Sequence, residues 1–187
     1  LNLYNKLVAI YSAASRTYHD LTHIEESIIE LAAFREQAGE MHPIHREYVA
    51  AFLALWGHDA FLGEEGEKVS ADMLTGILLE CGYGMEFAQL VSGMVIVTDH
   101  TTRPVTEMQM LVKDIDLIRL ASPRFSDYTE ELIKENKDSK LSRDEYLARQ
   151  KKFMKVTFLS STRIFCTDYY YSRYETRAQI NVQTFCA

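Results

Sequence analysis

The chain has 187 residues, of which 47% are hydrophobic and 25% are charged, with only three prolines and eight glycines. This composition excludes a long disordered or fibrous chain and suits one globular domain, so we expect a single domain over residues 1–187. The formal net charge is -7 and no run rich in lysine and arginine occurs, which argues against binding to duplex nucleic acid through a basic surface.

Cysteine usage and hydropathy suggest where the protein works. The three cysteines, Cys81, Cys166 and Cys186, are odd in number and far apart, unlike a disulfide framework or a zinc knuckle. No apolar run is long enough to span a bilayer. We therefore expect a cytoplasmic protein that does not bind membranes.

The first half of the chain has apolar residues at helical spacing almost throughout. A stripe from Leu3 to Tyr11 predicts a first helix, and Thr22 with Glu25 predicts a capping box for a second. Pro43 is expected to open a third helix that runs to Trp56. Ser70 is expected to begin a fourth, which stops at Gly82.

The second half continues in the same way. Apolar helices are predicted from Phe87 to Val97 and after Pro104, and an amphipathic one over SDYTEELIKENK. Ser142 and Glu145 form a second capping box, before a helix that reaches about Leu159, and a last helix covers roughly Tyr171 to Phe185. Without a convincing strand, these segments predict an all-α helical bundle of about eight helices.

Two histidines four residues apart lie in the segment RTYHDLTHIEE. His19 and His23 are one helical turn apart, so both imidazoles can face the same side of a helix. The segment by itself does not distinguish a chemical pair from two histidines that share a helix face.

A His-Asp pair ends the apolar helix in LALWGHDAF. His58 and Asp59 diverge by about 100° if both are helical, yet both can reach one point that borders the end of the helix. The alternative is a histidine that favours the helix dipole beside a solvated aspartate.

Two aspartates follow in LVKDIDLIRL. Asp116 shares the register of Val112 and lies beside Ile115, so we expect it to point inward, whereas Asp114 falls on the more polar side. A buried carboxylate needs a partner, either a salt bridge to an arginine such as Arg119 or a metal ion. A divalent ion held by two imidazoles and two carboxylates would lower the pKa of a bound water and neutralise phosphate charge.

These segments, in this order, resemble the HD superfamily of metal-dependent phosphohydrolases, and most closely a small bacterial branch of predicted HD phosphohydrolases. The matching segments are RTYHDLTHI, ALWGHDAF, GEKVSADM, TDH, DIDLIRL and AQINV, which extend from about Tyr11 to Val182. The branch has R-x-Y-H-x-x-x-H-I, A-x-W-x-H-D, N-E-x-x-S-A, T-x-x-H, D-L and A-R-x-N-L in these places. The ordered set is specific, whereas each short piece is weak alone.

The resemblance implies a set of roles. The metal ligands would be His23, His58, Asp59 and Asp116, and His19 would protonate a leaving oxygen or contact phosphate. Asp59 and Glu67 would take part in catalysis, Glu67 by orienting the attacking water. Arg16, His100 and Lys134 would contact substrate. The alternative role for His19 is a hydrogen bond that orients a ligand.

Three positions depart from the pattern of the family. Gly66 precedes Glu67 where the family has asparagine, Lys134 stands where arginine is expected, and Gln179 replaces the late arginine. Two cationic positions are therefore weakened or lost, which counts against a polyphosphate site.

The expected cofactor is one divalent metal ion per chain, with manganese, iron, cobalt, nickel, zinc and magnesium all open. Binuclear HD proteins supply two further histidines between the HD pair and the last aspartate, and this chain has only His100 there. The expected substrate is a nucleotide or another small phosphate ester. The alternatives are an HD-type di-iron oxygenase and a non-catalytic module that binds metal or nucleotide. The aromatic run DYYYSRY is expected to pack internally or in a subunit contact, so a homo-oligomer is also open.

Overall fold

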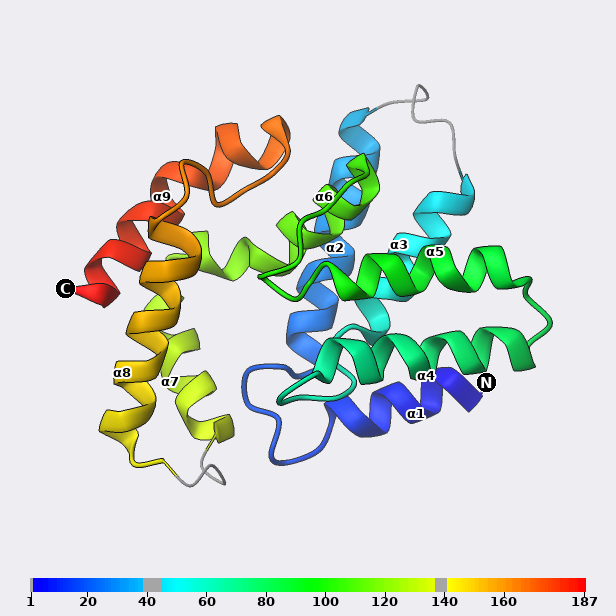
Figure 1. Ribbon diagram of the computed structural model, residues 1–187, viewed down its shortest axis with the longest axis horizontal. Coiled ribbons are helices and arrows are strands. Elements are labelled where there is room, and N and C mark those ends of the chain that lie inside the picture. Colours follow the sequence, from blue (N-terminus) through cyan, green and yellow to red (C-terminus); the bar gives the residue numbers. More distant parts are fainter. Residues whose placement is uncertain (1, 39–44, 137–140) are drawn as a thin grey trace. The chain divides into compact units, whose positions relative to one another are not determined.

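The computed structural model describes residues 2–38, 45–136 and 141–187, and every regular element within them is a helix (Figure 1). The expected all-α class is thus confirmed, with nine α-helices in these ranges. Contacts group the chain into two compact units, residues 1–13 with 19–116 and residues 14–18 with 117–187. The expectation of a single domain over 1–187 stays a prediction.

The first unit contains six α-helices. They are α1 (Asn2–Tyr11), α2 (Leu21–Ala38), α3 (His45–Gly57), α4 (Gly66–Glu80), α5 (Met85–Ile96) and α6 (Glu107–Asp116). Pro43, the expected start of the third helix, lies outside the described residues. The fourth helix begins at Gly66 rather than at Ser70, because the Ser70 hydroxyl accepts a hydrogen bond from the Phe61 N–H at 3.0 Å instead of capping a helix.

Helix α3 lies at the centre of the packing in the first unit. It contacts α2, α4, α5 and α6, and α4 packs along α5 (Figure 1). A core cluster of four buried residues then joins α1, α2 and the turn after α3: Leu7, Tyr11, Ile24 and Ala60. The end of α3 is therefore surrounded by other elements of this unit, and any side chain there is held by its neighbours.

The second unit contains α7 (Phe125–Glu135), α8 (Arg143–Met154) and α9 (Asp168–Cys186). A 3₁₀ helix, η2 (Leu117–Ala121), packs against α9 and α7, and a π-helical turn, η4 (Lys155–Leu159), continues α8. The capping box of Ser142 and Glu145 is confirmed at the start of α8. The buried side chains of α9 are Tyr170, Glu175, Ala178, Val182 and Cys186.

Candidate metal centre

His23 lies in the first turn of α2. The Asp20 carboxylate accepts a hydrogen bond from the His23 backbone N–H at 3.0 Å, so Asp20 caps this helix. The expected capping box was wrong, because Thr22 is already inside the helix. The cap fixes the first turn, and the His23 side chain there is buried beside Ile24.

His58 and Asp59 directly follow the last residue of α3, in the turn that leads toward α4. The preceding residue, Gly57, lies so close to the Leu74 side chain that a Cβ there would come within 2.5 Å of it. Leu74 is fully buried. The glycine thus lets α4 pack against the end of α3, which holds the His-Asp pair in place.

Asp116 is the last residue of α6. The expectation that Asp114 points outward was wrong, since Asp114 is 0% exposed. The physical reason is that α6 contacts α2, α3 and α5, so consecutive residues from Leu111 to Ile115 are all buried. A helix packed on several sides has no polar face for the sequence pattern to identify.

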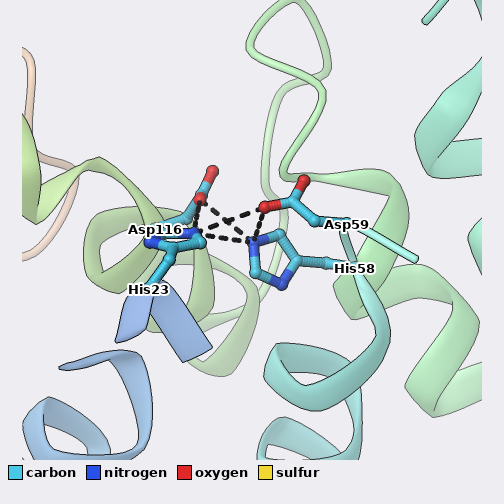
Figure 2. Close-up of side chains that lie close together, drawn as sticks. All are labelled: His23, His58, Asp59 and Asp116. Atoms are coloured by element: carbon cyan, nitrogen blue, oxygen red, sulfur yellow. Dashed lines mark hydrogen bonds and ion pairs between the residues drawn. The ribbon is translucent and has the colours of Figure 1, made fainter. Parts of the chain in front are cut away.

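The four residues with the expected ligand role lie together in the first unit (Figure 2). The Nε2 atom of His58 is 3.0 Å from Asp59 Oδ2 and 3.1 Å from Asp116 Oδ1. The Nε2 atom of His23 is 3.3 Å from each of the same two oxygens, and the two Nε2 atoms are 3.3 Å apart. Three helices or helix ends thus bring two nitrogens and two oxygens to one point.

These separations match what a metal ion requires. An ion bonded at about 2.1 Å holds neighbouring ligand atoms about 3.0 Å apart in octahedral geometry and about 3.4 Å apart in tetrahedral geometry. The five distances above run from 3.0 to 3.3 Å, and all four atoms lie within 4.8 Å of one another. The cluster could therefore hold a metal ion, and the mixed nitrogen and oxygen set suits a transition metal.

The tautomer of His58 is suited to a ligand. Its Nδ1 lies 3.0 Å from the carbonyl oxygen of Leu55, which only accepts hydrogen bonds. Nδ1 therefore carries the hydrogen, and in the neutral ring the lone pair of Nε2 faces the other three groups.

The charges of the cluster attract a cation. Burial lowers the pKa of His58, but the carboxylates of Asp59 and Asp116 more than offset it and hold that pKa well above its ordinary value. Burial likewise raises the pKa values of both aspartates, yet the neighbouring imidazoles hold them below the usual range. In the metal-free cluster, a proton on His58 partly balances the negative charge of the two carboxylates. A bound divalent ion would balance the same charge.

His19 lies beside this cluster but outside it. Its ring centroid is 6.1 Å from that of His23, with the rings edge to face, and its positive charge helps to lower the pKa of Asp59. His19 is partly exposed, whereas His23 is buried. The two imidazoles thus lie next to each other, but only His19 is in contact with solvent.

Glu67 lies in the first turn of α4, directly after Gly66. A Cβ at Gly66 would come within 2.7 Å of the Phe61 carbonyl oxygen, so the asparagine of the resembling family would not fit this backbone. The glycine at this position therefore fits the close approach of the Phe61 carbonyl at the start of α4.

His100 lies in the turn after α5 and faces several charges. Burial lowers the pKa of its imidazole, the charges of Asp116, Glu67 and Asp59 raise it, and that of Lys113 lowers it further, so the net shift is downward. The structure thus places His100 where the charges of Asp116, Asp59 and Glu67 act on its imidazole, while the functional roles of His100 and Glu67 stay predictions.

Three positions that the family resemblance singled out, Arg16, Lys134 and Gln179, belong to the second unit. Arg16 is half-buried, and Lys134 is exposed on α7. Gln179, at the place of the late arginine, donates a hydrogen bond to the Glu175 carboxylate at 2.9 Å. The roles of Arg16 and Lys134 toward a substrate stay predictions, and Gln179 has a structural partner.

Sequence reasoning missed Lys113. Its side chain is 8% exposed, and its ammonium group donates to the carbonyl oxygens of Asp99, His100 and Thr102. The available signal was a lysine directly after Leu111 and Val112, inside an apolar helical stripe. A lysine in such a place is rarely buried unless its charge is met by partners.

Comparisons of the chain with family models, with curated proteins and with solved structures found no match. The resemblance to the HD superfamily therefore depends on the ordered motifs and on the cluster that they form. Among the described helices, none has the length and apolar character needed to cross a bilayer.

Proposed function

We propose that this chain is an HD-type, metal-dependent phosphohydrolase that acts on a nucleotide or another small phosphate ester. The observation that supports it most strongly is the cluster of His23, His58, Asp59 and Asp116, whose donor atoms have the spacing of metal ligands. The proposal also uses the residues around this cluster.

The four cluster residues would hold the ion. When bound, a divalent ion there lowers the pKa of a coordinated water and neutralises charge on a phosphate group. The two carboxylates balance the charge of the ion, and the Leu55 carbonyl keeps His58 in the required tautomer.

His19 would act as the general acid. Hydrolysis forms a bond from phosphorus to a water oxygen and breaks the bond to the leaving oxygen, which then needs a proton. His19 is more exposed than His23, and its ring is close enough to Asp59 to lower the pKa of that carboxyl. These properties suit donation of a proton to the leaving oxygen.

Glu67 and His100 would complete the site within the first unit. The carboxylate of Glu67 can accept a hydrogen bond from water and so orient it, while His100, with its lowered pKa, is suited to donate a hydrogen bond as a neutral ring. The expectation that Arg16 and Lys134 contact the substrate comes from the family resemblance and stays a prediction. The roles of Glu67 and His100 follow the family resemblance, and they are supported by the charges of Glu67, Asp116 and Asp59 that act on the His100 imidazole.

The alternatives make different demands on the chain. A di-iron oxygenase needs a second set of ligands, and within the ranges that the structure describes a single group of residues qualifies as a metal site. A non-catalytic module would keep the metal without hydrolysis, and the replacement of the late arginine by Gln179 favours it.

Two measurements test the proposal. Elemental analysis of the purified protein should give one divalent metal per chain, and a screen for phosphate release over nucleotides, repeated with several metals, should find a hydrolysed substrate. Asp59→Asn should abolish release, whereas Asp72→Asn, an exposed aspartate on α4, should leave it unchanged. Metal without any phosphate release would favour the binding module, and two irons per chain would favour the oxygenase.

A further inference from the structure

The turn that carries His100 is held from its outer side by Asp99. The Asp99 carboxylate accepts hydrogen bonds from the Thr101 backbone N–H at 3.0 Å, from the Thr101 hydroxyl at 2.9 Å and from the Thr102 hydroxyl at 3.3 Å. Just before it, the Thr98 hydroxyl donates to the Val95 carbonyl oxygen at 2.7 Å. These bonds restrict the backbone on both sides of His100.

The same turn is held from its inner side by Lys113. The ammonium group donates to the carbonyl oxygens of Asp99 at 3.4 Å, of His100 at 3.3 Å and of Thr102 at 2.7 Å. Three donors meet three acceptors, which is the full capacity of an ammonium group. The side chain is 8% exposed, so these bonds compensate for removing a charge from water.

Helix α6 connects this turn to the metal cluster. Lys113 and Asp116 are three residues apart on α6, so they lie on neighbouring turns of the same helix face. One rigid element therefore sets the distance between the turn of His100 and a carboxylate of the cluster. The charge of Asp116 is accordingly the strongest attractive influence on the His100 imidazole.

We infer that Lys113 is a positioning residue, whose three hydrogen bonds fix the Asp99–Thr102 turn so that His100 contacts the phosphate of a substrate at the metal cluster. This inference rests on the function proposed above. Lys113 donates hydrogen bonds to three backbone carbonyls of the turn, so we expect its effect on a bound phosphate to pass through His100. A methionine of similar length would fill the same space without donating, which makes Lys113→Met the informative change.

The first test observes His100 directly and needs no activity. Long-range ¹H–¹⁵N spectra of ¹⁵N-histidine-labelled protein, metal-free and zinc-loaded, report the tautomer and environment of each imidazole, and His100→Ala identifies the His100 signals. Lys113→Met should shift and broaden these signals, while those of His23 and His58 stay in place. Lys152→Met, an exposed lysine on α8, should change none of them. Unchanged His100 signals in folded Lys113→Met would overturn the inference.

The second test uses inorganic phosphate as the probe. Calorimetric titration into zinc-loaded protein freed of excess zinc should show phosphate affinity reduced about tenfold in His100→Ala, the size expected for one lost hydrogen bond to a charged group. Lys113→Met should give a similar loss with zinc affinity retained. If Lys113 acts through His100, as inferred, the double variant should be no weaker than His100→Ala. Additive losses would overturn the inference.

Two controls separate the possible failures. If Lys113→Met does not fold, Asp99→Ala loosens the same turn from its outer side and should alter the same His100 signals; unaltered signals there would also count against the inference. If the wild-type protein binds no phosphate and hydrolyses no ester, the proposed function fails, and the spectra still decide whether Lys113 fixes His100. If the spectra and the double variant agree with expectation but no ester is hydrolysed, positioning holds for a site that binds phosphate without turnover.

Discussion

Carboxylates that are largely shielded from solvent occur in both units of this chain, and they have different partners. In the second unit, Glu175 accepts hydrogen bonds from the backbone N–H groups of Ile164 and Phe165 at 2.9 to 3.1 Å and from the Gln179 amide at 2.9 Å. In the first unit, Asp59 and Asp116 meet the imidazole nitrogens of two histidines.

The difference separates a structural carboxylate from a binding site. The backbone donors around Glu175 are held in place by the fold and suffice for its two oxygens, so nothing further is needed to bury it. In the cluster, two carboxylates come together with two imidazole nitrogens that are themselves good ligands, so the group could hold a metal ion. The predictions below test this distinction, beginning with the largest expected effect on the metal centre.

Removal of a cluster side chain should remove the metal. His58→Ala and Asp59→Ala should each lose bound metal and, with it, the stability that the metal contributes. Elemental analysis after dialysis and a thermal unfolding curve measure the two effects. A variant that keeps one metal per chain would exclude its residue from the ligand set.

Substitution of Asp116 should affect metal binding, whereas substitution of Asp114 should affect stability. Asp116→Asn should weaken metal binding by more than about 100-fold, which is the upper end of the loss for residues that only support a ligand. Asp114→Asn should keep the metal but lower the free energy of unfolding, because Asp114 is fully buried and is not one of the four residues that form the candidate site. Competition with a metal chelator and denaturant unfolding distinguish them. The reverse pattern would make Asp114 the ligand.

His19 should matter for turnover rather than for the metal. His19→Ala should retain the metal and reduce turnover by about two orders of magnitude, as expected for loss of a general acid. The loss should shrink for a nitrophenyl phosphate ester, whose leaving group needs no proton. Equal losses for good and poor leaving groups would indicate substrate positioning instead, and loss of metal would make His19 a ligand.

Metal affinity should rise with pH. The pKa of His58 is raised in the metal-free cluster, so its imidazole keeps a proton at pH values where an ordinary histidine has lost it. Metal binding must displace that proton, so the affinity should increase by up to about tenfold per pH unit and level off above the raised pKa. The two aspartates have lowered pKa values, so they are already ionised in this pH range and do not add to the pH dependence of metal affinity. Titrations at several pH values measure it, and a flat profile would mean that His58 is neutral before binding.

Glu175→Gln should leave the metal centre unchanged. The substitution replaces one acceptor oxygen by an amide that faces backbone donors, so it should lower the free energy of unfolding by about 1 to 3 kcal/mol. Metal content should be that of the wild type. Loss of metal in this variant would contradict the distinction between the structural carboxylate of Glu175 and the carboxylates of the cluster.

Much of the fold was determined by local sequence. Helical spacing of apolar residues identified the segments that form α1 to α9, and the Ser142–Glu145 box identified the start of α8, because both signals act within a few residues. Helix starts were less predictable: Asp20 caps α2 in place of Thr22, and α4 begins at Gly66. Several residues near each start could cap, and packing selects among them.

The candidate site was identified from ordered motifs, and its geometry came only from tertiary structure. The segments around His23, His58 and Asp116 are far apart in the chain, and no local pattern says that their side chains meet within 3.3 Å. The spacing of apolar residues likewise did not predict that Asp114 and Lys113 are buried. Periodicity identifies one apolar face of a helix, whereas α6 is packed on several sides, and its charged residues are buried because distant carbonyl and side-chain partners compensate them.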